Sequence, residues 1–87
     1  KTKIESGNWE VDITIKKGVI QEVELEHGSI HPGFLSDLSS TLKLMPLRKE
    51  VLEHRFSKLE LDMYKERVLE LKALINEYFI KDFEDLA

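Results

Sequence analysis

The side chains best able to do chemistry in this chain are three histidines and many carboxylates. His27 and His31 are four residues apart, but the intervening Gly28 and the following Pro32 keep them off one helical turn. His54 lies further along, in a segment with helical periodicity. The three imidazoles could supply a three-ligand metal site. The alternative, which we favour, is that they are exposed and unconnected and that the chain binds no metal.

The carboxylates and serines do not form a recognisable catalytic pattern. Paired carboxylates need unlike environments to separate their pKa values, and those of this chain lie in uniformly polar surroundings. The serines lack the flanking glycines of a nucleophile elbow, and the chain has no phosphate-binding loop, GxGxxG or HExxH motif. We therefore expect no catalytic residue in this chain.

Composition narrows the class of protein further. The chain has 87 residues, 41% of them hydrophobic and 34% charged, as in an ordinary soluble domain. A net charge of -4 argues against nucleic-acid binding. The absence of cysteine excludes disulfides, thiol catalysis and iron–sulfur ligation and suits a cytoplasmic protein. No apolar run approaches the ~20 residues of a membrane span, so we expect no membrane partner.

A β-hairpin over residues 9–27 is the first element that positions polar groups. Apolar and polar residues alternate along both halves of this segment, which predicts two strands. A three-residue loop at 16–18, closed by a glycine in the left-handed region, would join them. This loop sets a register in which Trp9 faces Leu25. Gln21 is then the one polar residue on the apolar side.

The polar side of the same hairpin is acidic. In the predicted register Asp12 faces Glu22 and Glu10 faces Glu24. Like charges directly opposite each other are destabilising. Either the side is simply solvated, with relief from a third strand at residues 1–3, or it is a surface that binds a basic partner. The four acidic residues are the candidate partner interface.

Two helices are predicted after the hairpin. Pro32 suits the first turn of a helix, and apolar residues at helical spacing carry that helix to about Lys43. Pro46 interrupts it and suits the start of a second helix, with an apolar stripe that ends at Phe56.

A third helix is predicted over residues 60–79, with Val68 and Tyr78 on its apolar stripe. Ser57 and Glu60 have the spacing of a capping box at its start. A single bent helix through this point is the alternative.

Strands first and helices after predict an α+β fold. We expect a two-layer sandwich in which about three helices cover one face of a small antiparallel sheet. Residues 1–87 would form one domain, with a frayed tail at 81–87.

The sequence WEVDITIKKGVIQEVEL from Trp9 to Leu25 resembles the accessory domain of lipoate–protein ligases. A basic residue and a glycine precede it, and Gly28 and the helix at Pro32 follow it as in that family. Leu42 and Pro46 also fit the family spacing. In many bacterial ligases this domain is C-terminal, and in some archaeal ones it is a separate small subunit.

The resemblance implies a fold similar to that of sulfur-transfer and iron–sulfur scaffold proteins. The absence of cysteine argues against the scaffold function itself. The family often has Gly-Asp-Phe-Phe after the second strand, of which only Gly28 is kept here. Lys1 or Lys3 corresponds to the basic residue of the family, and we expect one of them to approach the nucleotide or acyl-adenylate.

The resemblance also implies a function. A large catalytic subunit or domain uses ATP, Mg and lipoate to form lipoyl-adenylate, and passes the acyl group to a lysine of a lipoyl-acceptor protein. The accessory domain packs against it and helps to close the site, binding no cofactor alone. The alternative is a protein-interaction module unrelated to lipoate that uses the acidic side of the hairpin. The sequence leaves open the acceptor, the oligomeric state, and whether the chain is a free subunit or part of a longer one.

Overall fold

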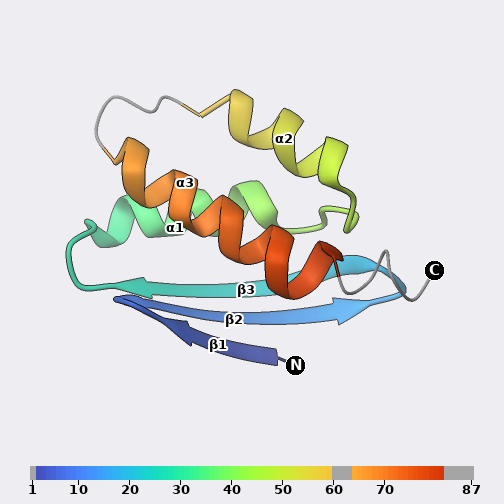
Figure 1. The fold of residues 1–87 in the computed structure, drawn as a ribbon, viewed down its shortest axis with the longest axis horizontal. Coiled ribbons are helices and arrows are strands. Elements are labelled where there is room, and N and C mark those ends of the chain that lie inside the picture. Colours follow the sequence, from blue (N-terminus) through green and yellow to red (C-terminus); the bar gives the residue numbers. More distant parts are fainter. Residues whose placement is uncertain (1, 60–63, 82–87) are drawn as a thin grey trace. The chain divides into compact units, whose positions relative to one another are not determined.

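A computed structural model describes residues 2–59 and 64–81, and Figure 1 shows the course of the chain. It contains a three-stranded antiparallel sheet and three helices, which confirms the predicted α+β class. The chain divides into two compact units, residues 1–45 and 46–87. That the whole chain forms one accessory domain stays a prediction. The elements are β1 (Thr2–Ser6), β2 (Trp9–Lys16), β3 (Val19–His27), α1 (Pro32–Leu42), α2 (Lys49–Ser57), α3 (Lys65–Ile75) and a π-helical turn, η1 (Asn76–Ile80).

The first unit holds the sheet, in the order β1-β2-β3. The predicted third strand is present as β1, and it places Lys3 opposite Asp12 of β2. Gly7 and Asn8 join β1 to β2. Gly7 has a φ of +57°, and a positive φ at the first central residue is the pattern of a type II′ hairpin turn.

The turn between β2 and β3 differs from the prediction. Lys17 has a φ of 55° and Gly18 a φ of 74°. Positive φ at both central residues defines a two-residue type I′ turn, whose twist matches that of the flanking strands. The predicted three-residue loop at 16–18 is therefore wrong, and Trp9 lies opposite His27 instead of Leu25.

A β-bulge reconciles this short turn with the alternating sequence. Ile15 lies opposite Ile20 and Thr14 opposite Glu22, so Gln21 is an extra residue in β3. One extra residue shifts the register by one, which returns apolar residues to one face and polar residues to the other. Gln21 thus stands out in the apolar pattern because it is the bulged residue.

Helix α1 completes the core of the first unit. It packs against β3, and its bounds confirm the predicted helix at Pro32. His31 caps its start, because the His31 Nδ1 accepts a hydrogen bond from the Gly33 N–H at 3.0 Å. Leu38 and Leu42 of α1 are fully buried. The buried strand residues of the unit are Trp9, Val11, Ile13, Ile20, Leu25 and His27.

In the second unit, α2 begins at Lys49, later than the predicted start at Pro46. Ser57 is the last residue of α2, and its hydroxyl donates to the His54 carbonyl at 2.6 Å. The prediction that Ser57 caps the next helix is wrong, because this hydroxyl is bonded back into its own helix. Glu60, the other half of the predicted capping box, lies outside the described residues.

Helix α3 ends in the π-helical turn η1, and this turn changes which residues of the last helical segment face the core. Val68 is buried as predicted, but Tyr78 is 44% exposed whereas Phe79 is 5% exposed. A π-helical turn contains more than the 3.6 residues of an α-helical turn, and this moves the apolar position from Tyr78 to Phe79. The prediction for Tyr78 is therefore wrong. Of the predicted tail, residues 82–87 lie outside the described part.

Candidate functional site

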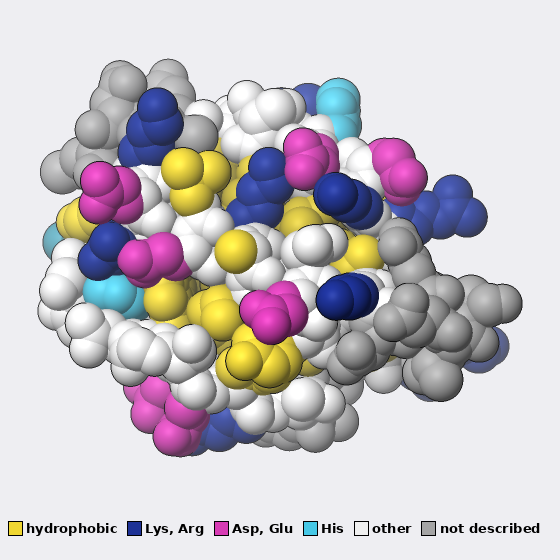
Figure 2. All heavy atoms as spheres, in the orientation of Figure 1, with side chains coloured by type: hydrophobic (Ala, Val, Ile, Leu, Met, Phe, Trp, Pro, Cys, Tyr) yellow, Lys and Arg dark blue, Asp and Glu magenta, His cyan; other side chains and the backbone are white. Residues whose placement is uncertain are grey.

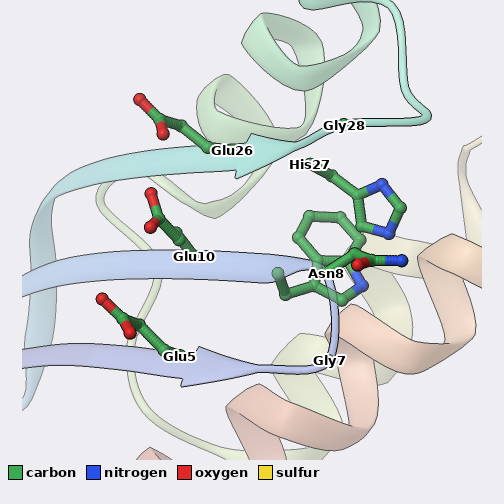
Figure 3. Close-up of a pocket in the computed structure, with 8 residues that line it drawn as sticks. Glu5, Gly7, Asn8, Glu10, Glu26, His27 and Gly28 are labelled. Carbon is green, nitrogen blue, oxygen red and sulfur yellow. The ribbon is translucent and has the colours of Figure 1, made fainter.

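One face of the sheet carries carboxylates from all three strands. Glu5 of β1 lies opposite Glu10 of β2, which lies opposite Glu26 of β3. Directly opposed residues point to the same face, and Figure 3 shows the three side chains extending in the same direction. Three glutamates therefore form a row across the whole sheet.

Further carboxylates extend this row along the strands. Asp12 lies between Lys3 and Glu24, and Glu22 lies opposite Thr14. The predicted pairing of Asp12 with Glu22 and of Glu10 with Glu24 is wrong by two residues, one because the turn is shorter than expected and one because Gln21 is bulged. The four predicted acidic residues still share one face. We call this surface the acidic face; it consists of Glu5, Glu10, Asp12, Glu22, Glu24 and Glu26.

The six carboxylates of the acidic face outnumber the described lysines on it, Lys3 of β1 and Lys16 of β2. Lys3 lies on it, with its Nζ 3.7 Å from a carboxylate oxygen of Glu5. Each directly opposed pair of like charges costs stability, so the face is a good match for a basic surface, which would remove that repulsion.

Among the described residues, no group of three or more His, Asp or Glu side chains is placed to hold a metal ion.

The predicted nucleotide-proximal residues do not come together. Lys1 lies outside the described residues. Lys3 is in β1, and Gly28 directly follows β3, the other outer strand. Strand geometry puts the two residues roughly 10 Å apart across the sheet and roughly 13 Å apart along it. Gly28 instead borders an open hollow of about 310 Å³, together with the turn at Gly7 and Asn8.

The fold itself does not require a glycine at position 28. Its φ is not positive, and a Cβ built there meets nothing within 4 Å. At Gly7, in contrast, the φ of +57° makes any side chain strained. The backbone at Gly28 is therefore open to close approach from outside.

Two of the three histidines, His27 and His31, accept hydrogen bonds within the fold. His27 is only 7% exposed, and its ring lies 4.8 Å from that of Trp9 in an edge-to-face arrangement. Its Nδ1 accepts a hydrogen bond from the Ser29 N–H at 3.1 Å. The prediction that His27 is exposed is wrong, because the actual register pairs it with Trp9. His31 caps α1, and His54 is exposed on α2.

Sequence reasoning missed Glu5 and Glu26 because both gain their partners only in the observed register. It also missed a groove of about 760 Å³ between β3 and α1. The combination of Lys17-Gly18 with the misfit at Gln21 was the available signal for the register. Among the described residues on the face shown in Figure 2, Lys and Arg side chains stand among Asp and Glu side chains and gather into no basic patch.

Comparison with known proteins now identifies the family. A family model of the bacterial lipoate protein ligase C-terminus matches residues 1–78. The chain belongs to this family. The match spans both compact units and confirms the resemblance seen in residues 9–25. No curated protein and no solved structure matches the chain. The similarity of its fold to that of sulfur-transfer proteins stays a prediction. Within the described residues, no helix has the length and apolar character needed to cross a membrane.

Proposed function

We propose that this chain is a non-catalytic accessory part of a lipoate–protein ligase. It enables a catalytic partner domain or subunit to convert lipoate and ATP, with Mg²⁺, into lipoyl-adenylate. The observation that carries the proposal is the match of residues 1–78 to the ligase C-terminal family. ATP, Mg²⁺ and lipoate are held by the catalytic partner, which then transfers the lipoyl group to the acceptor protein.

The acidic face is the surface proposed to bind the catalytic partner. Glu10 lies opposite Glu5 and Glu26, and Asp12 lies opposite Glu24 on one side and Lys3 on the other. A basic partner surface would offset the repulsion among these carboxylates. Binding of the chain then favours the closed form of the adenylate-forming site and excludes water from it. Lys1 or Lys3 is proposed to approach the nucleotide, and the open backbone at Gly28, which follows the other outer strand, is proposed as a separate point of approach.

The test is reconstitution with the catalytic ligase protein, ATP, Mg²⁺ and lipoate, with pyrophosphate release as the readout. We expect release to rise with added chain and to saturate at equal stoichiometry. A chain carrying Glu10→Lys and Glu26→Lys should need a higher concentration for the same effect. The matched control carries Glu50→Lys and Glu77→Lys on exposed helical positions, with the same change in net charge, and should behave as wild type. Identical release with and without the wild-type chain would contradict the proposal.

The acidic face also favours a second candidate, an interaction module unrelated to lipoate. In that case affinity capture from lysate would recover a dominant partner that is not a ligase, and the Glu10→Lys, Glu26→Lys chain would lose it. Recovery of a lipoate–protein ligase would favour the first proposal instead.

A further inference from the structure

At one end, the outer edge of β3 pairs with another segment of the same chain. β3 is an outer strand of the sheet. At its start, the Ile20 N–H donates to the Met45 carbonyl at 2.9 Å, and the Leu44 N–H donates to the Ile20 carbonyl at 2.7 Å. This edge therefore already accepts backbone partners from a neighbouring segment.

Beyond Ile20, the edge has no such partner strand in the part of the chain that the structure describes. Alternate residues of a strand direct their N–H and C=O groups to the same side. The His27 carbonyl accepts a hydrogen bond from the Ile30 N–H at 3.3 Å, outside the sheet. The same alternation places the N–H and C=O groups of Val23 and Leu25 on the outer side. These are the groups that an added strand would pair with.

The groove of about 760 Å³ runs along this edge. Its strand wall is formed by consecutive residues of the segment Val23–Gly28. Side chains of a strand alternate between faces, so an unbroken run of lining residues means that the backbone edge itself borders the groove. The segment is roughly 20 Å long at 3.3 Å per residue, which accommodates a short strand.

Helix α1 forms the opposite wall of the groove. The lining residues are Pro32, Leu35, Ser36 and Ser39, which are spaced as one face of a helix. Leu35 gives this wall an apolar centre, and the small serine side chains leave room beside it. A groove between an exposed strand edge and a helix suits the binding of an extended peptide by strand addition.

The charge of β3 decides between possible occupants. Glu24 and Glu26 are exposed, and they alternate with the apolar Val23 and Leu25. A second copy of β3, added with its faces matched, would bring glutamates against glutamates. A register shifted by one residue would place its apolar side chains on the acidic face. An occupant with basic residues in place of the glutamates avoids both costs.

We infer that this groove binds an extended segment of the catalytic partner, with alternating basic and apolar residues, as a fourth strand of the sheet. Its basic side chains lie on the acidic face, and its apolar side chains lie toward Leu25 and Leu35. The identity of the partner rests on the proposed function, whereas the groove and its preference for a basic strand rest on this chain alone.

The groove can be tested without the ligase. The probe is an acetylated and amidated peptide of alternating lysine and valine, six residues long, with a glutamate–valine peptide as the control. We expect the lysine peptide to slow amide hydrogen exchange at Val23 and Leu25 of the full chain roughly tenfold at saturation, and the control to leave it unchanged. Unchanged exchange with the lysine peptide would overturn the inference. So would protection that appears without peptide and grows with chain concentration, because the occupant is then a second copy.

Variants then test the same groove in the complex with the catalytic ligase protein. Ser36→Trp fills the groove, and Ser40→Trp is the matched control on an exposed position of α1 outside it. Val23→Pro removes an outward N–H at the sheet edge, where proline is tolerated. We expect Ser36→Trp and Val23→Pro to weaken binding roughly tenfold or more, and Ser40→Trp to leave it unchanged.

The outcomes separate the two proposals. If the wild-type chain binds the catalytic protein and both groove variants bind equally well, the groove inference is wrong and the proposed function stands. If the wild-type chain neither binds nor raises adenylation, the proposed function is wrong, and the peptide experiment still decides the groove.

Discussion

Replacing Glu10 by Gln should make this chain more stable. Glu10 is the middle carboxylate of its row, with Glu5 opposite it on one side and Glu26 on the other. A like-charged cross-strand pair costs about 0.2–1 kcal/mol. The lower part of that range applies here, because Glu10 is only partly buried and water screens the charges. Removal of both repulsions should raise the free energy of unfolding by about 0.5–1 kcal/mol.

Thermal unfolding measures this change directly. One kcal/mol moves the midpoint of a domain of this size by about 4–8 °C, so Glu10→Gln should raise it by about 2–8 °C. The matched control is Glu50→Gln. Glu50 is exposed in the first turn of α2, where a negative charge interacts favourably with the helix dipole. Glu50→Gln should therefore leave the free energy of unfolding unchanged or lower it slightly.

Salt tests the electrostatic origin of the gain. At 1 M salt the Debye length falls to about 3 Å, so the advantage of Glu10→Gln should shrink to a small fraction of its low-salt value. A variant less stable than wild type, or a gain that salt does not change, would refute the reasoning. The same variant should bind the catalytic partner more weakly, which is the expected trade of stability against function at a binding surface.

Four further substitutions test local features. Lys17→Asn creates the Asn-Gly pair preferred in type I′ turns and should raise the free energy of unfolding by about 0.5–1 kcal/mol in urea unfolding; a loss would contradict the two-residue turn. Leu44 has a φ of 62° and is 59% exposed, so Leu44→Asn should stabilise by a similar amount in the same assay, and a clear loss would show that its side chain packs. Gly28→Ala should change stability by less than about 0.5 kcal/mol, whereas Gly7→Ala should cost about 1 kcal/mol; equal thermal midpoints would contradict the difference in backbone conformation. If Gly28 lies near the nucleotide, Gly28→Ala should slow adenylation with stability unchanged.

The sequence predicted the fold class and the strongest local signals. Period-two alternation along residues 9–27 identified both strands, and Pro32 marked the start of α1. The predicted register is wrong because a change in turn length and a bulge have opposite effects on which face the apolar residues occupy. A three-residue loop without a bulge and a two-residue turn with Gln21 bulged both return apolar residues to one face, and the hydrophobic pattern alone does not separate them.

The candidate site was predictable only in part. That Glu10, Asp12, Glu22 and Glu24 share a face follows from alternation, and this survives the change of register. The row through Glu5 and Glu26 depends on the actual pairing of three strands. The groove depends on where α1 lies beside the outer edge of β3, and periodicity within one element carries no information about that placement.

The most direct test of the accessory role is single-turnover formation of lipoyl-adenylate by the catalytic ligase protein. We predict that adenylate formation is slow or absent without this chain, is restored by the wild-type chain, and is restored less well by the chain carrying Glu10→Lys and Glu26→Lys. Equal formation of adenylate with and without the wild-type chain would contradict the role proposed for it.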